Sequence, residues 1–248
     1  MKIKLINYVD QIIQDFKKSQ GLILSGRVFI NNEKATSLNV LVREKDKVEI
    51  LQKEHYVSRG AYKLLHAIET WKLDFKDKVV IDIGSSTGGF TQVSLEQGAK
   101  TVYCVDSGTN QLDYNLRQDA RTIVLENTNL KILDQNLIPD AIDFIVCDVS
   151  FISLREVFKV AKLFKSKHLE LILLIKPQFE ALKEFVEDKG VVPVKFHNEI
   201  IEKVKNYDKD NFAFIALETS PILGKKSKNT EYLAHFIRKE KNESSRNC

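Results

Sequence analysis

A short segment of the chain, residues 81–90 (IDIGSSTGGF), has the residue types of a ligand-binding loop. An apolar run ends on Asp82, and a glycine, three small hydroxyl residues and two further glycines follow. Glycines let the backbone approach a ligand closely, and free N–H groups at the start of a helix attract polar or anionic groups. Asp106 ends the next apolar run, where an acid suits hydrogen bonds to ribose hydroxyls. These residues predict a site for a nucleotide-like ligand.

The spacing of the glycines narrows the choice of nucleotide. The dinucleotide fingerprint G-x-G-x-x-G requires a glycine two positions after the first, whereas Ser86 stands two positions after Gly84. Dinucleotide enzymes use that spacing to hold a pyrophosphate against the start of a helix. The loop therefore disfavours a nicotinamide-dependent oxidoreductase, and no partner for hydride transfer is evident. The loop alone leaves open a second explanation, a glycine turn needed only for tight packing.

The segments around this loop alternate between two hydrophobic patterns, which predict a fold of the α/β class. Apolar runs typical of buried strands occupy residues 78–84, 101–106, 121–126, 141–150 and 169–176. Apolar residues recur at helical spacing in residues 89–97, 110–118, 154–165 and 198–206. Strands that alternate with helices predict a doubly wound, mostly parallel sheet covered on both faces. An antiparallel end of this seven-stranded sheet is predicted by two last strands without a clear helix between them, residues 211–220 and 230–237.

The first 53 residues predict a separate α+β unit. Apolar residues show helical spacing in residues 7–16 and 17–25. The run from Val28 to Ile30 leads into Asn31-Asn32, and asparagines tolerate the positive φ of a hairpin turn. Residues 46–51 alternate as a further strand. A unit of this size buries little surface, so we expect it to be an appendage to a larger domain.

Polar segments separate and end these units. Residues 54–58 are interpreted as a linker, and Ser58 is the expected N-cap of the helix that follows, which contains Leu64 and Trp71. Residues 241–248 form a polar tail that is expected to fray.

The net charge of +4 is concentrated in the N-terminal unit. Residues 1–53 hold ten of the 38 Lys and Arg but six of the 34 Asp and Glu, which leaves 28 of each sign in the remainder. This asymmetry favours contact with a nucleic acid or another anionic surface at the N-terminus, although a solvated lysine-rich face would have the same composition.

The overall composition is that of a soluble globular protein, with 43% hydrophobic and 29% charged residues. No apolar stretch reaches the roughly 18 residues that span a bilayer, and the N-terminus lacks a signal-peptide core. The cysteines Cys104, Cys147 and Cys248 lie far apart and the histidines form no H-E-x-x-H pattern. We therefore expect no disulfide framework, no metal site and a location in the reducing cytoplasm.

Six further pieces carry a family resemblance. They are YVSRGAYKL, GSSTGGFTQVSLEQGA, VDSGTNQL, CDVSFISLREV, LLIKPQFE and NTEYLAHF. In this order the pieces resemble the TlyA (haemolysin-named) family of rRNA 2′-O-ribose methyltransferases, within the wider FtsJ-like group, and the resemblance covers nearly all of the chain. GLILSGRVFINNEKA is similar to the signature of that family's RNA-binding domain of ribosomal-protein type, although residues 1–53 match it in a degenerate form.

The resemblance implies a class I, Rossmann-like methyltransferase domain at residues 59–240 that uses S-adenosylmethionine. A Lys–Asp–Lys–Glu set is implied around the reacting hydroxyl, namely Lys63, Asp148, Lys176 and Glu231. Asp148 and Lys176 follow predicted strands at the same sheet edge as Gly84 and Asp106, so their placement agrees with the strand pattern. Lys176 is interpreted as the base or the partner of the forming alkoxide, oriented by Asp148 and Glu231, while Lys63 holds the ribose or a phosphate.

The remaining site residues are expected to contact the cofactor and the RNA. The cofactor is implied to lie against Asp82, Gly84, Ser85, Ser86, Thr87, Gly88, Gly89, Phe90 and Asp106. Positive side chains are the candidates for phosphate contacts with the RNA, namely Arg27, Arg59, Lys225, Lys226 and Lys228, although a solvated surface cluster is equally expected for the last three. Phe151 and Phe179 could form a wall against the target base, although at least one of them is expected in the core.

The implied substrate is a cytidine ribose hydroxyl in ribosomal RNA, within a subunit or the intact ribosome, and the implied protein is a monomer. Two alternatives stay open, a membrane-active haemolysin and an RNA-binding protein without catalytic activity. The sequence leaves the target nucleotide and the subunit undecided.

Three departures from the family pattern stand out. Ser85 replaces the usual alanine, EDKGVVP (residues 187–193) replaces a more glycine-rich stretch, and the N-terminal residues lack several basic and small side chains. The second departure concerns the geometry of the loop after PQFE, and the third concerns RNA binding by the N-terminal unit on its own.

Overall fold

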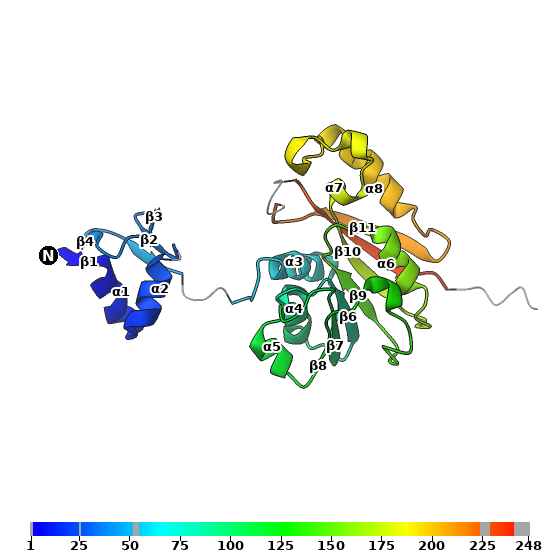
Figure 1. The fold of residues 1–248 in the computed structure, drawn as a ribbon, viewed down its shortest axis with the longest axis horizontal. Coiled ribbons are helices and arrows are strands. Elements are labelled where there is room, and N and C mark those ends of the chain that lie inside the picture. Colours follow the sequence, from blue (N-terminus) through cyan, green and yellow to red (C-terminus); the bar gives the residue numbers. More distant parts are fainter. Residues whose placement is uncertain (1, 25, 52–54, 224–228, 241–248) are drawn as a thin grey trace, which may run out of the picture. The chain divides into compact units, whose positions relative to one another are not determined.

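The computed structural model describes residues 2–24, 26–51, 55–223 and 229–240, drawn in colour in Figure 1. The chain divides into two compact units, Met1–His55 and Tyr56–Cys248, which we call the N-terminal unit and the main unit.

The N-terminal unit packs two helices with short antiparallel strands. Its elements are β1 (Lys2–Lys4), α1 (Leu5–Ile13), α2 (Phe16–Leu24), β2 (Val28–Ile30), β3 (Glu33–Ala35), β4 (Leu41–Arg43) and β5 (Val48–Ile50). Strand β1 pairs with β4, and β2 lies between β3 and β5. The predicted hairpin is confirmed, since Asn31 and Asn32 join β2 to β3 with φ of 52° and 68°.

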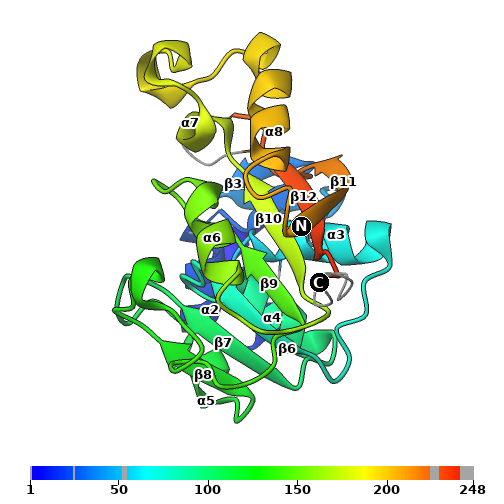
Figure 2. The same ribbon diagram turned by 90° about the vertical axis from the view of Figure 1, so that its right-hand side faces the viewer.

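The main unit is built on one seven-stranded sheet, whose order is β11-β12-β10-β9-β6-β7-β8 and can be followed in Figure 2. The strands are β6 (Val79–Ile83), β7 (Thr101–Val105), β8 (Thr122–Leu125), β9 (Phe144–Cys147), β10 (Glu170–Ile175), β11 (Phe212–Thr219) and β12 (Tyr232–Arg238). Strands β6 to β10 pair in parallel, whereas β12 runs antiparallel to both β10 and β11. The predicted α/β class, the parallel centre and the antiparallel end are therefore confirmed.

Helices cover both faces of this sheet. The helices are α3 (Ala61–Trp71), α4 (Gly89–Glu96), α5 (Tyr114–Gln118), α6 (Leu154–Ala161), α7 (Pro177–Glu180) and α8 (His197–Lys205). Short 3₁₀ turns lie at η1 (Leu130–Ile132), η2 (Lys183–Phe185), η3 (Asp188–Gly190) and η4 (Val194–Phe196). One core packs α3, α4 and α5 against the sheet, and a second core packs α6 and α8 against the other face (Figure 1).

The aromatic centre of the second core illustrates why the apolar runs become buried strands. Phe158 of α6 is 2% exposed and meets Phe212 and Phe236 of the last two strands at ring-centroid distances of 5.7 and 5.0 Å. Full burial of one such side chain stabilises the fold by about 2–3 kcal/mol. This packing holds β12 beside β10 and so places the carboxyl end of β10 next to the start of β12.

Two element boundaries beside the glycine loop differ from the sequence-based expectation. The prediction that Ser58 caps the first helix of the main unit was wrong, because α3 begins at Ala61 after Gly60, and no side chain caps it. The helix predicted from residue 110 begins at Tyr114 instead, because Asp113 is the N-cap and its carboxylate accepts the Asn115 N–H. Ser58, Arg59, Gly60 and Gln111, which lie outside the observed helices, line the site described below.

Among the described residues, no helix combines the length and the apolar character needed to cross a membrane.

Candidate active site

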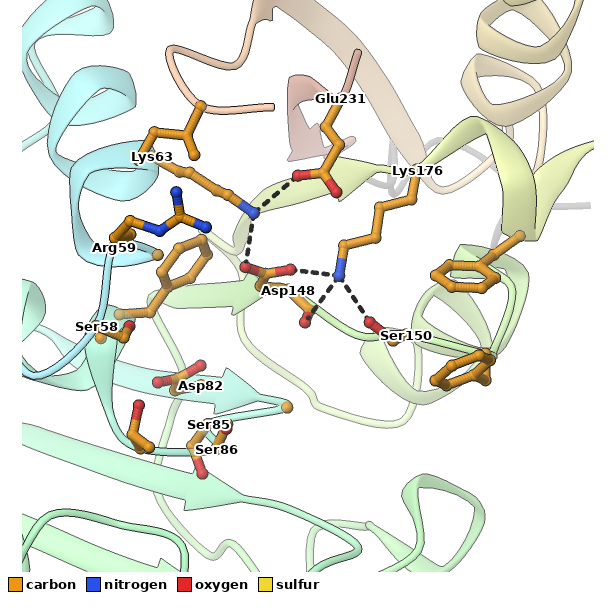
Figure 3. Close-up of a pocket in the computed structure, with 18 of the residues that line it drawn as sticks. Ser58, Arg59, Lys63, Asp82, Ser85, Ser86, Asp148, Ser150, Lys176 and Glu231 are labelled. Atoms are coloured by element: carbon orange, nitrogen blue, oxygen red, sulfur yellow. Dashed lines mark hydrogen bonds and ion pairs between the residues drawn. The ribbon is translucent and has the colours of Figure 1, made fainter. Parts of the chain in front are cut away.

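Four charged side chains form a continuous chain of ion pairs at the carboxyl edge of the sheet (Figure 3). We call them the ion-pair cluster: Lys63, Asp148, Lys176 and Glu231. Lys63 Nζ lies 2.8 Å from Glu231 Oε2 and 3.1 Å from Asp148 Oδ2. Lys176 Nζ lies 2.6 Å from Asp148 Oδ1. The four residues that the sequence predicted to act together are therefore in contact, with Asp148 bridging the two lysines.

The topology explains how four distant positions meet. Asp148 follows β9 and Lys176 follows β10, which are parallel neighbours and so end at the same edge. Strand β12 runs the other way, and its first residue Tyr232 pairs with Ile175, the last residue of β10. Lys176, which follows Ile175, and Glu231, which precedes Tyr232, therefore lie at the same edge of the sheet. Lys63 reaches the group from the first turn of α3, which packs over the sheet.

The ion-pair cluster is buried, and its carboxylates keep Lys63 positively charged. Lys63 and Lys176 are each 8% exposed and Glu231 is 4% exposed. Burial of Lys63 lowers its pKa, but the carboxylates of Asp148 and Glu231 raise it by more, so the net pKa lies above the ordinary value. Lys63 therefore stays an ammonium ion at neutral pH.

The pairing of Glu231 differs from the sequence-based interpretation. Glu231 was expected to orient Lys176, but its carboxylate instead forms an ion pair of 2.8 Å with Lys63. Lys176 is held instead by Asp148 Oδ1, by Ser150 Oγ at 2.9 Å and by the Asp148 carbonyl at 3.5 Å. The physical reason is the side from which α3 enters, because it brings Lys63 between the two carboxylates.

The glycine loop, residues 84–89, is shaped by its main chain. Gly84, Ser86 and Gly88 adopt φ of 80°, 47° and 96°, which glycine tolerates best. The Asp106 carboxylate accepts hydrogen bonds from the N–H groups of Ser86 at 2.8 Å and Gly108 at 2.7 Å. Asp106 therefore ties the glycine loop to the residues after β7 and keeps lone pairs for a ligand.

Asp82 lies beneath this loop and is almost fully buried. Its Oδ2 atom accepts the Thr91 hydroxyl at 2.7 Å, whereas its buried Oδ1 atom has no hydrogen-bond partner among the described residues. Burial raises the pKa of Asp82 to about 7, against a partial lowering by the Thr91 hydrogen bonds. An unpartnered buried carboxylate oxygen is costly, so it suits a ligand that brings a positive charge or a donor.

Two of the glycines serve packing. A Cβ on Gly88 would lie 2.4 Å from Leu116 Cδ1, and one on Gly89 would lie 2.2 Å from Ser58 Oγ. Gly88 lines neither of the two hollows that the described residues form at this edge. The packing explanation therefore holds for Gly88, while the other residues of the loop face the hollows.

Two adjoining hollows lie along this edge of the sheet. The first, of about 490 Å³, is lined by the ion-pair cluster and by the glycine loop except Gly88, together with Ser58, Arg59, Gly60, Asp82, Phe90, Ser150, Phe151, Gln178, Phe179, Ile222 and Leu223. The second, of about 480 Å³, lies over Asp106 and is lined also by Ser107, Gln111, Thr128, Asn129, Leu130, Val149 and Ile152. Gly84, Ser86, Asp148, Ser150 and Phe151 line both. The shared wall joins a nucleoside-sized space to the ion-pair cluster.

Several lining residues were missed by the sequence analysis. Thr128 and Asn129 follow the third parallel strand, β8, and Ser107 and Gln111 follow Asp106. The rule that ligands bind at the carboxyl ends of strands was applied to the other parallel strands, and the same rule applied to β8 would have found Thr128 and Asn129. No sequence pattern predicts that Ser58 lines the hollow, because it does so only since α3 begins at Ala61 and not at Ser58.

The predicted RNA contacts fall in three places. Arg59 is exposed and lines the first hollow beside Lys63 (Figure 3). Arg27 is half-buried and precedes β2 in the N-terminal unit. Lys225, Lys226 and Lys228 lie outside the described residues. Within the part of the chain that the structure describes, no group of three or more His, Cys, Asp or Glu side chains could hold a metal ion.

The sheet order, the glycine loop and the acid after the second strand together define the class of nucleotide-dependent α/β methyltransferases. Solved methyltransferases of this class share the fold, among them an S-adenosylmethionine-dependent enzyme from Listeria monocytogenes at a TM-score of 0.52 and 14% identity over 73% of this chain and 99% of that chain. The FtsJ-like methyltransferase family model matches residues 56–238. The chain belongs to the FtsJ-like methyltransferase family.

Curated relatives extend the similarity over most of the chain. Hemolysin A of Brachyspira hyodysenteriae is 40% identical over 89% of this chain and 92% of that protein. The 23S rRNA (cytidine-2′-O)-methyltransferase TlyA of Campylobacter jejuni is 36% identical over 85% and 83% of the two chains. The 16S/23S rRNA (cytidine-2′-O)-methyltransferase TlyA of Mycobacterium tuberculosis is 34% identical over 87% and 82%.

Proposed function

We propose that this protein methylates the 2′-hydroxyl of a cytidine ribose in ribosomal RNA, with S-adenosylmethionine as the methyl donor. The observation that carries the proposal is the buried ion-pair cluster, which borders the same hollow as the glycine loop. The names of two relatives, both rRNA (cytidine-2′-O)-methyltransferases, supply the substrate class.

The two hollows would hold different portions of the cofactor. Asp106, Ser107 and Asn129 offer hydrogen-bonding groups to an adenosine in the second hollow. The loop backbone and the unpartnered Oδ1 of Asp82 suit the positively charged methionine portion in the first hollow. When bound, S-adenosylmethionine supplies a methyl group activated by a positively charged sulfur.

The ion-pair cluster prepares the nucleophile. A ribose hydroxyl is a weak nucleophile at neutral pH, so its proton must be accepted or its developing negative charge stabilised. Lys63 faces two carboxylates and stays charged, so it acts as a fixed positive group that holds Asp148 and Glu231 in place. Lys176 contacts one carboxylate and two neutral oxygens, Ser150 Oγ and the Asp148 carbonyl, and it lines the first hollow. We assign the base to Lys176.

Alignment is the second contribution of the site. Methyl transfer is an in-line displacement, and holding the reacting atoms in line supplies much of the rate. Asp148 directly follows the buried strand β9, and its carboxylate forms ion pairs with both lysines. The sheet therefore determines the position of Lys176 Nζ. The ion pairs thus form without the RNA.

An exposed aromatic side chain suits the target base. Phe151 is 84% exposed, adopts φ of 67° and packs against Phe179 with the ring centroids 5.0 Å apart. A large side chain held in a strained conformation and open to solvent beside the ion-pair cluster is a platform for stacking a base. The expectation of a core role for one of these rings does not apply to Phe151.

Positive groups at the rim of the hollow complete the RNA contacts. Arg59 is exposed beside the ion-pair cluster and suits the phosphate next to the target ribose. The N-terminal unit, with Arg27, is proposed as an additional RNA-binding domain over residues 1–53, joined by the linker 54–58 to the methyltransferase domain 59–240.

The test is methyl transfer from labelled S-adenosylmethionine to unmodified large and small ribosomal subunits, each isolated separately. We expect label in the RNA of at least one subunit and none with Lys176→Ala, while calorimetry shows cofactor binding by both proteins. Lys176→Arg separates the two possible roles of the lysine, because arginine keeps the positive charge but cannot act as a base. An inactive Lys176→Arg variant supports the assignment of Lys176 as the base. No label from the wild-type protein, despite cofactor binding, would refute the proposed substrate.

A further inference from the structure

Two segments that the sequence singled out, residues 148–154 (DVSFISL) and 176–180 (KPQFE), are joined at both ends. They leave neighbouring parallel strands, β9 and β10, and are tied at their first residues by the Asp148–Lys176 ion pair. They are tied again at their last residues, where the Glu180 carboxylate accepts the Leu154 N–H and the Ser153 hydroxyl, each at 2.7 Å. Together the two segments form a closed frame.

The residues between the two ties line the first hollow. On one segment these are Ser150 and Phe151, and on the other they are Gln178 and Phe179. Phe151 and Phe179 pack against each other across the frame, and Ser150 contacts Lys176. Every hollow-lining residue of the two loops is therefore held between the Asp148–Lys176 tie and the Glu180 tie.

Glu180 itself lies outside the hollow. It is 3% exposed and does not appear among the residues that line either hollow. Its Oε2 atom also accepts the Tyr207 hydroxyl at 2.6 Å, and its carbonyl accepts Lys203 Nζ at 2.7 Å, so it is anchored to α8 and the turn behind it. A buried carboxylate whose two oxygens both accept hydrogen bonds is held in a fixed position.

We propose that Glu180 is a positioning residue for methyl transfer, which acts by closing the frame and so holding Lys176 and Ser150 in register with Asp148. The structural alternative is that Glu180 only stabilises the fold around α6 and α8. The two roles predict different effects of changing the Glu180 carboxylate. A positioning role predicts a change at the ion-pair cluster, because the frame includes Asp148 and Lys176, whereas a structural role predicts a change only around α6 and α8.

The first test compares Glu180→Gln with Tyr207→Phe. The amide offers one acceptor oxygen in place of two and removes the charge, which loosens the tie to Ser153 and Leu154. Tyr207→Phe removes a hydrogen bond to the same carboxylate but leaves that tie in place. We expect Glu180→Gln to lower the single-turnover rate about 10- to 100-fold at unchanged cofactor affinity, and Tyr207→Phe to change the rate less than about threefold. Equal rate losses in the two variants would overturn the proposal.

The second test does not depend on methyl transfer, on whose assignment the rate test rests. Lys176 and Lys63 are equally exposed, but the backbone of Lys63 belongs to α3 and its nearer partner is Glu231, both outside the frame. Amine acylation followed by mass spectrometry should show Lys176 labelled several-fold faster in Glu180→Gln, with Lys63 unchanged. Unchanged Lys176 labelling, or an equal rise at both lysines, would show that Glu180 does not position Lys176. A wild-type protein that binds cofactor but methylates no rRNA would refute the proposed function and leave this labelling result decisive.

Discussion

The glycine loop and the ion-pair cluster border the same hollow but are built in opposite ways. The loop is one contiguous stretch whose shape comes from main-chain angles and from the absence of side chains at Gly88 and Gly89. The cluster gathers side chains from α3, from the ends of β9 and β10 and from the start of β12. One region depends on local conformation and the other depends on the order and direction of strands.

This difference predicts separate vulnerabilities. A change of volume should damage the loop, because Leu112 and Leu116 already occupy the space beside Gly88. A change of charge should damage the cluster, because each buried ammonium or carboxylate there is balanced by a neighbour. Cofactor binding and methyl transfer should therefore be separable by single substitutions.

The largest effect is expected from Asp148→Asn, which removes the charge that bridges Lys63 and Lys176. Methyl transfer should fall about 1,000-fold or more, because the positions and charge balance of both lysines are lost, while cofactor affinity changes less than about threefold. Asp143→Asn is the matched control, since Asp143 precedes the same strand at its other end and accepts the Val79 N–H. Single-turnover rates and calorimetry decide the matter; more than a tenth of wild-type activity in Asp148→Asn would contradict the role of the cluster.

Gly88→Ala is expected to weaken cofactor binding, which Asp148→Asn leaves nearly unchanged. The new Cβ would lie 2.4 Å from Leu116 Cδ1 at a φ of 96°, so both a steric clash and backbone strain oppose it. We expect a loss of about 2–4 kcal/mol in the free energy of unfolding and at least about tenfold weaker cofactor binding.

Gly190→Ala is the control for this substitution. Gly190 has a φ of 76°, but none of the residues that the structure describes lies within 4 Å of its Cβ position, so we expect only the strain of about 1 kcal/mol. Denaturant unfolding and calorimetry compare the two variants. Equal destabilisation would show that backbone strain, not packing against Leu116, explains Gly88.

The contrast between the two regions also explains which features could be predicted from sequence. The glycine loop, the Asn31-Asn32 turn and the alternation of strands and helices depend on neighbouring residues, and each was found from the pattern of residue types. The four members of the cluster came from the family resemblance, because no local spacing connects Lys63 with Glu231.

The pairing within the cluster could not be predicted. It depends on the register that places Tyr232 opposite Ile175 and on the direction from which α3 crosses the sheet, and neither is encoded by a short pattern. The position of Phe151 is a similar case, since a phenylalanine in an apolar-looking segment is expected in a core, whereas strain and strand topology leave it in solvent. Lys189 likewise takes φ of 65° where the family pattern favours a glycine.

A smaller effect, on pH dependence, is expected from Asp82. Its pKa is about 7 in the folded protein against 3.8 as the ordinary value, so between these values the folded state binds more protons than the unfolded state. The free energy of unfolding should therefore decrease as the pH rises, by about 1 kcal/mol between pH 6 and 7 from this group alone.

Asp82→Asn isolates this contribution, because other groups titrate in the same range. The difference in slope between wild type and Asp82→Asn is the measured quantity, from urea unfolding at several pH values. Ionised Asp82 should also favour a positively charged ligand, so cofactor affinity should rise with pH in the wild type and stay level in the variant. Parallel slopes in both proteins would contradict the raised pKa.

The smallest effect is expected from Ser86→Gly, which tests whether the glycine loop acts through its main chain. Ser86 adopts φ of 47°, and its hydroxyl donates an exposed hydrogen bond of 3.2 Å to Gln111. Glycine relieves the strain but loses this bond and gains freedom in the unfolded chain, so the net change should stay within about 0.5 kcal/mol and about twofold in cofactor affinity. Ser86→Ala keeps the strain and loses the bond, so it should be the weaker binder of the two. If Ser86→Gly instead bound the cofactor more than tenfold more weakly, the hydroxyl would be a direct ligand, and the loop would resemble the ion-pair cluster in depending on side chains.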